Sequence, residues 1–289
     1  MKRNSYSSLA FAAVVAMGLV ASSLAIADGG INCLPPVNTP NANSAVLDLR
    51  TFNDCPASTL TAINAYPSLI SINDTDVECV GWTNLHTWSF SEDGITRAQF
   101  ENCSHYKFSC VFNGMTTGAG VGEGGLRLSP WWNTWWGGPP VDGRFMVRIG
   151  GNGEIACFGG RLPFYSFTSG WGVTYTPGTD IWMEIVYSPH ALTLADPARI
   201  IYKIYYQGVG YFSPALPFDE GAVGPTEGDI HGNWGELFPA TAGGYFQEPN
   251  GSGGALFNFT GKWQNIHYEG PSATPASQPT WGQLKTLYR

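Results

Sequence analysis

The sequence carries little charge for its length. Of its 289 residues only 14 are basic and 22 acidic, about half the charged share that is usual in a soluble domain. A disordered chain needs more charge and fewer aromatic residues, and a helical bundle needs many Glu, Lys, Ala and Leu residues at a helical period. The net charge of −8 also lacks the basic footprint that binds phosphate backbones. We therefore expect a folded protein that does not bind nucleic acid.

Long apolar runs are missing after the N-terminus. Lys2 and Arg3 precede an apolar stretch over 9–20, and Ala25 and Ala27 stand where a signal-peptide cleavage site prefers small residues. A membrane span needs about 18 or more apolar residues in a row, and no later segment reaches that length. The pattern predicts a bacterial signal peptide over 1–27, cleaved near Ala27, and a secreted or cell-surface protein without a membrane span. The alternative is an uncleaved N-terminal anchor.

The sequence also lacks a Cys-x-x-Cys pair matched by two histidines, so we expect no structural zinc site of that type. Six cysteines follow the predicted signal peptide: Cys33, Cys55, Cys79, Cys103, Cys110 and Cys157. An even number in an exported protein predicts up to three disulfides. Cys103 and Cys110 flank a short polar turn, and we predict that they pair. The pairing of the other four is open.

Glycine and aromatic residues are abundant, with 37 Gly, 11 Trp, 13 Tyr and 16 Phe. Short apolar or aromatic runs alternate with clusters of Gly, Pro, Asn and Asp at the spacing of strands and turns. Period-2 alternation gives a strand one buried and one outward face, and it is found over 106–112, 143–149, 181–187, 199–206, 255–259 and 262–268. These patterns predict an all-β protein.

The chain divides into four parts by composition. We predict the signal peptide over 1–27, an irregular leader over 28–45, one β-sandwich domain over 46–270, and a Pro/Ser/Thr linker with a short C-terminal tail over 271–289. No repeat of fixed period is visible, which weighs against a propeller or solenoid.

The order of the strand motifs resembles a known superfamily. Gly-Leu-Arg-Leu, Asp-Gly-Arg-Phe-Met-Val-Arg-Ile, Asp-Ile-Trp-Met-Glu-Ile-Val-Tyr and a closing Lys-Trp-Gln-Asn-Ile-His-Tyr follow one another as in the concanavalin A-like lectin/glucanase (LamG-like) jelly rolls. The resemblance implies a jelly-roll β-sandwich of two antiparallel sheets, here supported by disulfides. The chain is also similar to uncharacterised exported bacterial proteins, a similarity that implies no chemistry.

One segment resembles the catalytic strand of the retaining glucanases in that superfamily. Glu227, Asp229 and His231 alternate, and Glu236 follows. Alternation places such side chains on one face, where two carboxyl groups about 5 Å apart would act as nucleophile and general acid/base. His231 stands where that motif needs a carboxylate. We therefore interpret the four as weak catalytic candidates and a solvated loop as the simpler alternative.

A second enzymatic interpretation is polysaccharide β-elimination. Arg144 and Arg148 share one strand face and could neutralise a uronate. Tyr202, Tyr205 or Tyr206 could supply a phenol and His231 a base. The Gln-x-His pair of lyases that resemble this fold is absent. Outward-facing arginines on a sheet are the simpler alternative.

The most unusual feature is a tryptophan run in a turn-like context of Pro and Gly. It consists of Trp131, Trp132, Trp135 and Trp136. Indole rings stack on the apolar faces of sugars, and exposed clusters of this kind mark binding sites. We predict a ligand-binding site for carbohydrate or an extracellular protein surface, with rings folded back on the core as the alternative.

Calcium is a candidate cofactor, and Asp219, Glu220 and Asp229 are the candidate residues that would supply its oxygen ligands. Taken together, these features predict a secreted, non-catalytic β-sandwich that binds carbohydrate or a surface partner through aromatic loops. Two alternatives stay open. One is a polysaccharide-cleaving enzyme, a hydrolase or lyase of the same fold. The other is a self-associating subunit of an extracellular assembly or filament, because surfaces with little charge associate.

Overall fold

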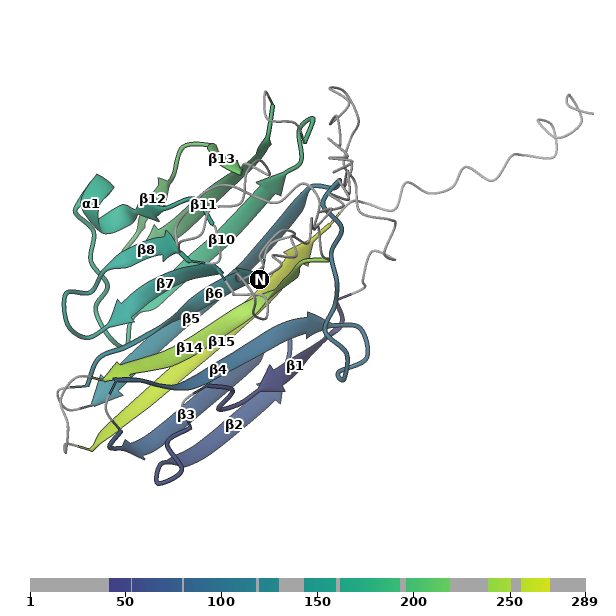
Figure 1. The fold of residues 1–289 in the computed structure, drawn as a ribbon. Coiled ribbons are helices and arrows are strands. Elements are labelled where there is room, and N and C mark those ends of the chain that lie inside the picture. Colours follow the sequence, from purple (N-terminus) through teal and green to yellow (C-terminus); the bar gives the residue numbers. More distant parts are fainter. Residues whose placement is uncertain are drawn as a thin grey trace, which may run out of the picture. The chain divides into compact units, whose positions relative to one another are not determined.

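Two antiparallel sheets make up the fold (Figure 1). The structure is a computed structural model that describes residues 42–52, 54–79, 81–117, 120–129, 143–159, 162–192, 196–218, 239–250 and 256–270. Within these residues the predicted all-β sandwich of two antiparallel sheets is confirmed. The first strand begins at Ser44 and the last ends at Glu269.

The first sheet has seven strands in the order β1-β4-β14-β6-β7-β8-β9. Their bounds are β1 Ser44–Asp48, β4 Gly81–Ser91, β6 Gly122–Ser129, β7 Gly143–Ile149, β8 Ile155–Phe158, β9 Tyr165–Ser166 and β14 Thr241–Asn250. Strands that are neighbours here come from distant parts of the sequence, as with β4 beside β14. Residues far apart in the chain are therefore brought to one face.

The second sheet has eight strands in the order β12-β11-β10-β5-β15-β3-β2, with β13 paired to β11. Their bounds are β2 Thr59–Ala65, β3 Leu69–Val77, β5 Tyr106–Thr117, β10 Asp180–Ser188, β11 Ala198–Tyr206, β12 Val209–Phe212, β13 Leu216–Phe218 and β15 Phe257–Glu269. The chain changes sheet repeatedly along the sequence, at β1–β2, β3–β4, β4–β5, β5–β6, β9–β10, β13–β14 and β14–β15, so the two layers are built together (Figure 1).

The core lies between the sheets and is rich in aromatic rings. Trp88 of the seven-stranded sheet meets Trp263 of the eight-stranded sheet edge to face, with ring centroids 6.3 Å apart. The Trp263 indole N–H donates to the Gly125 carbonyl across the gap, at 2.8 Å. Buried rings of this size dominate the hydrophobic energy of a core. Much of the aromatic excess therefore serves to build the sandwich.

The predicted alternation within strands is confirmed. In β7, Phe145, Val147 and Ile149 belong to the core, and Arg144 and Arg148 therefore lie on the opposite face. Residues 257–259 and 262–268 differ from the prediction of two segments, because they are parts of the single strand β15, Phe257–Glu269. Gly261 joins them without a turn. A Cβ there would lie 3.1 Å from the rings of Phe246 and Trp263, so glycine leaves room for the core.

The helix α1, Phe167–Trp171, has five residues. Its N-cap Ser166 accepts a hydrogen bond from the Ser169 amide, and Gly172 ends it with a φ of 69°, a conformation that glycine adopts readily. No helix in the described ranges has the length and apolar character needed to span a membrane.

The cysteines correct the sequence prediction. Cys55 and Cys79 form a disulfide, and Cys103 is also disulfide-bonded. Cys110 and Cys157 are free and buried, so the predicted Cys103–Cys110 bridge is wrong. The alternation of β5 points Cys110 into the core, where it pairs across the ladder with Met183 of β10. Burial raises the pKa of both free thiols. Cys33 lies outside the described residues.

Candidate functional site

The residues predicted for binding, catalysis and calcium lie outside the described ranges. They are Trp131, Trp132, Trp135, Trp136, Asp219, Glu220, Glu227, Asp229, His231 and Glu236. The tryptophans belong to the connection between β6 and β7, and the other six to the connection between β13 and β14. Their roles stay predictions. The described strands carry two further polar sites.

The first site lies on the outward face of the seven-stranded sheet, the face turned away from the eight-stranded sheet. We call it the arginine–aromatic cluster. It consists of Trp82 on β4, Glu123 on β6, Arg144 and Arg148 on β7, Phe158 on β8 and Tyr245 on β14. The pairing registers place these residues together, since Glu123 is opposite Arg148 and Arg144 is opposite Phe158.

Arg144 is the centre of this cluster. Its guanidinium carbon lies 5.5 Å from the ring centroid of Trp82, 5.9 Å from that of Tyr245 and 6.0 Å from that of Phe158. These distances are within the range of cation–π attraction. The three rings therefore hold the guanidinium against the sheet.

Glu123 supplies the negative charge. It is fully buried, with one oxygen 3.7 Å from Arg144 Nη1 and the other 3.6 Å from Arg148 Nη2. The arginine side chains are 23% and 28% exposed, and Trp82 is 39% exposed. Burial, followed by the charge of Glu123, raises the pKa of Tyr245. The cluster thus offers a partly exposed indole beside charged hydrogen-bonding groups.

The predicted lyase constellation is only half assembled. Arg144 and Arg148 do share a face, as predicted. The side chains of Tyr202 and Tyr206 are buried in the core, and the Tyr202 hydroxyl donates to the Pro163 carbonyl at 3.1 Å. A core tyrosine cannot reach a substrate on the outward face. The phenol beside Arg144 is instead Tyr245, which the sequence reasoning did not select.

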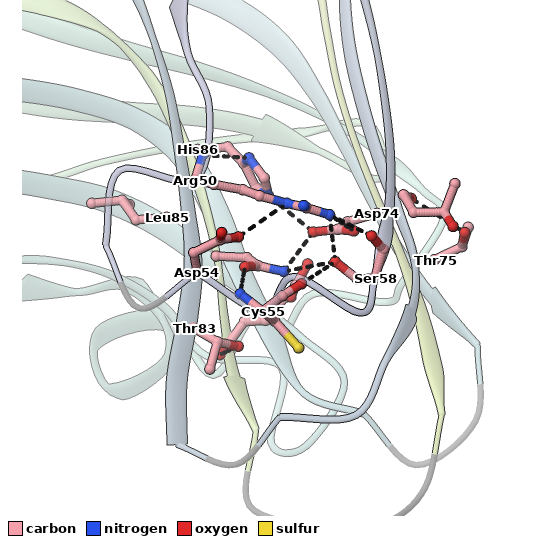
Figure 2. Close-up of polar contacts among 12 residues, drawn as sticks. Arg50, Asp54, Cys55, Ser58, Asp74, Thr75, Thr83, Leu85 and His86 are labelled. Atoms are coloured by element: carbon pink, nitrogen blue, oxygen red, sulfur yellow. Dashed lines mark hydrogen bonds and ion pairs between the residues drawn. The ribbon is translucent and has the colours of Figure 1, made fainter.

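The second site lies between the sheets, and we call it the interior cluster; Figure 2 labels its members Arg50, Ser58, Asp74 and His86. It contains Arg50, Ser58, Asp74, Asn84, His86 and Glu248. Asp74 projects from β3, Asn84 and His86 project from β4, and Glu248 projects from β14. Arg50 and Ser58 come from the segment between β1 and β2.

Asp74 is the acceptor at the centre of the interior cluster (Figure 2). The Asn84 amide donates to Asp74 Oδ2 at 2.7 Å, and His86 Nε2 lies 3.3 Å from the same oxygen. Arg50 Nη2 lies 3.5 Å from Oδ1 and also donates to the Ser58 hydroxyl at 2.6 Å. Burial alone would raise the pKa of Asp74, but the hydrogen bonds with His86 and Ser58 and the charge of Arg50 hold it below its usual value.

His86 has a defined tautomer in this arrangement. The Arg50 backbone N–H donates to His86 Nδ1 at 3.3 Å, so Nδ1 is the acceptor and Nε2 carries the proton of the neutral ring. That proton is donated to Asp74. The histidine therefore links the β1–β2 segment to the carboxylate.

Glu248 contrasts with Asp74. It is fully buried, and neither of its carboxyl oxygens has a hydrogen-bond partner within the described residues. Burial, followed by the negative charge of Asp74, raises the pKa of Glu248 to about 9, although Asn84 and Arg50 nearby act in the opposite direction. At neutral pH the metal-free protein therefore holds this carboxyl protonated.

A single residue connects the two sites. Asn84 has a φ of 45°, in the left-handed region that Asn tolerates better than most residues. This interrupts the alternation of β4. Trp82 therefore reaches the outward face, where it meets Arg144, and Asn84 and His86 point between the sheets, where they meet Asp74.

Sequence reasoning missed both clusters, although part of the signal was present. Glu123 and Arg127 alternate with Leu126 and Leu128 in β6, which places charges opposite a core face. Asp74 is different, because it stands two residues after Ile72 and four after Ile70 and therefore shares their buried, apolar face. A polar residue in the apolar register of a strand is the signal that could have revealed the interior cluster.

No protein-family model matches the chain, and no curated protein matches it. Similar solved structures exist. The CBM2 module of the evolved Dit of Lactobacillus casei BL23 phage J-1 is 12% identical, with 83% of this chain and 98% of that chain covered and a TM-score of 0.36. Lectin II from Ulex europaeus is 8% identical over 82% and 94%, with a TM-score of 0.38.

A third similar structure is the polysaccharide lyase family 18 protein aly-SJ02, 10% identical over 78% of this chain and 95% of that chain, with a TM-score of 0.33. At these identities and TM-scores the similarity does not extend beyond the fold. It does not indicate what this chain binds.

Proposed function

We propose that the chain is a secreted, non-catalytic β-sandwich that binds carbohydrate on the outward face of its seven-stranded sheet. The observation that carries this proposal is the arginine–aromatic cluster, in which Arg144 is held among three rings beside the buried Glu123. Sugars are bound by aromatic rings that stack on their C–H faces and by charged groups that hydrogen-bond their hydroxyls. The cluster supplies both kinds of group.

The proposal includes the tryptophan run at 131–136 as a second contact. This run joins β6 to β7, the two strands that carry Glu123 and Arg144, and its rings would extend the aromatic contact. Export through the predicted signal peptide over 1–27 is part of the same proposal. The mass of the mature chain recovered outside the cytoplasm tests it, because cleavage near Ala27 fixes the new N-terminus.

Retention on a polysaccharide array tests the binding site. Replacing Trp82 with Ala removes one stacking ring worth about 1 kcal/mol, and we expect affinity to fall about fivefold. Trp171→Ala is the matched control, because Trp171 is at least as exposed but belongs to α1. Equal retention of the Trp82→Ala variant and the unaltered chain would contradict the proposed site.

The tryptophan run is tested separately. A chain with Ala at all four positions, Trp131, Trp132, Trp135 and Trp136, is expected to lose retention on the same array. If it binds as the unaltered chain does, the run has no part in binding. Assaying the bound polysaccharides for new chain ends tests the absence of catalysis, since cleavage products would favour the hydrolase or lyase alternative.

A further inference from the structure

Three possible metal-ligating side chains converge in the interior cluster. Asp74, His86 and Glu248 come from three different strands of the two sheets, and each offers one ligand atom within 4.8 Å of the other two. All three side chains are fully buried. His86 Nε2 and Asp74 Oδ2 are 3.3 Å apart, the separation of two ligands that each lie about 2 Å from one zinc ion in tetrahedral geometry.

Glu248 provides an independent reason to expect a ligand. A buried carboxyl normally has hydrogen-bond partners, because leaving one unmade costs about 1–3 kcal/mol. Neither Glu248 oxygen has such a partner among the described residues, although the side chain is within reach of Asp74 and His86. A cation between the three side chains would satisfy this carboxylate directly.

We propose that Asp74, His86 and Glu248 bind a divalent transition metal, with Zn²⁺ as the matching ion. One imidazole nitrogen and two carboxylate oxygens form a ligand set that zinc accepts. The two carboxylates balance the charge of the ion. Calcium fits less well, because it takes six to eight oxygen ligands and does not favour imidazole. The site is separate from the arginine–aromatic cluster and does not depend on the proposed carbohydrate binding.

Arg50 is the competitor of the metal at this site. Its guanidinium lies 3.5 Å from Asp74 Oδ1 and is 20% exposed, so a cationic group already occupies the side of Asp74 that faces the β1–β2 segment (Figure 2). A metal on His86 Nε2 also requires the ring proton to move to Nδ1, which now accepts the Arg50 backbone N–H. Metal binding must therefore displace Arg50 from His86.

Two substitutions with opposite expected effects test the site. The full chain is freed of metal with a chelator, and Zn²⁺ is titrated by calorimetry. We expect one ion per chain. Glu248→Gln removes one ligand and should weaken binding at least tenfold, as loss of even an outer-shell partner costs about 10–100-fold. Arg50→Gln removes the competing charge and should strengthen binding about tenfold, because like charges at this distance repel.

The controls separate loss of the site from loss of the fold. Glu248→Gln should fold normally, because the amide resembles the protonated carboxyl, and its circular dichroism and melting temperature are measured alongside. Glu78→Gln, at an exposed carboxylate near β3, should leave binding unchanged. Co²⁺ should give a visible absorption band in the unaltered chain and none in Glu248→Gln. No zinc binding by the unaltered chain, or equal binding by the unaltered chain and Glu248→Gln, would overturn the proposal.

Discussion

Two fully buried glutamates of the same sheet have opposite surroundings. Glu123 on β6 lies on the outward face with an arginine near each oxygen, at 3.6 and 3.7 Å. Glu248 on β14 points between the sheets, and its carboxyl has no hydrogen-bond partner among the described residues. Its pKa is raised to about 9. Burying a carboxylate is costly unless a cation or hydrogen bonds accompany it.

The comparison shows two ways in which one sheet accommodates a buried acid. On the outward face the charge is kept and neutralised by partly exposed arginines, so the group remains a hydrogen-bond acceptor. Between the sheets the only nearby cation, among the described residues, is Arg50, which is committed to Asp74 and Ser58. Glu248 therefore takes up a proton in the metal-free protein, and a bound metal would replace that proton.

The largest expected effect comes from the disulfide next to the interior cluster. The Cys55–Cys79 bridge spans 24 residues and holds the segment that carries Arg50 and Ser58. Replacing both cysteines with Ala should lower the free energy of unfolding by about 3 kcal/mol, as measured in urea. Polysaccharide retention should be unaffected, because the outward face does not use this segment. If the double Cys→Ala variant folds but is no longer retained on the polysaccharide, the two sites are not independent.

An intermediate effect is expected for Glu123→Gln. Among the described residues the substitution removes the carboxylate that pairs with both Arg144 and Arg148, and it should destabilise the fold by about 2 kcal/mol. This is less than the 3–5 kcal/mol for a fully buried pair, because both arginines are partly exposed. Urea unfolding at pH 7 in a chelator measures it, with Glu248→Gln as the control expected to show no loss. Equal losses in the free energy of unfolding of the two variants would mean that the two glutamates do not differ in their need for a counter-charge.

The smallest effect, taken over one pH unit, is the pH dependence that Glu248 imposes. Its pKa in the folded protein is about 9 and its ordinary value is 4.5. Between these values the folded chain binds one more proton than the unfolded chain. The contribution of Glu248 to the free energy of unfolding is therefore fully present below pH 4.5. It is lost as the pH rises towards 9, by up to about 1.4 kcal/mol per pH unit.

Unfolding in urea at pH 6.5 and 7.5, with a chelator present, measures this slope. The unaltered chain should lose about 1.4 kcal/mol more than Glu248→Gln over that interval. If the free energy of unfolding changes equally with pH in the unaltered chain and in Glu248→Gln, Glu248 is ionised in the folded state.

The sequence predicted the strands well but not the sites. Alternation is local, so β7 and the core side of β5 could be predicted from their own residues. The meeting of Glu123 with Arg148 depends on the register between strands, and that of His86 with Glu248 on the pairing of β4 with the distant β14. No local pattern encodes such pairings. The Cys103–Cys110 prediction was wrong for a related reason, because closeness in sequence outweighed the inward direction of Cys110.

The left-handed backbone of Asn84 restricts how this protein can change over evolution. Glycine would accept the φ of 45° but would lose three side-chain hydrogen bonds, from the Cys55 amide at 2.7 Å, to the Ser58 hydroxyl at 3.1 Å and to Asp74 at 2.7 Å. Aspartate would keep the first bond but place a second negative charge beside Asp74. A β-branched residue would be strained at this φ. The arginine–aromatic cluster and the interior cluster thus both depend on Asn84, so a substitution there is expected to change both.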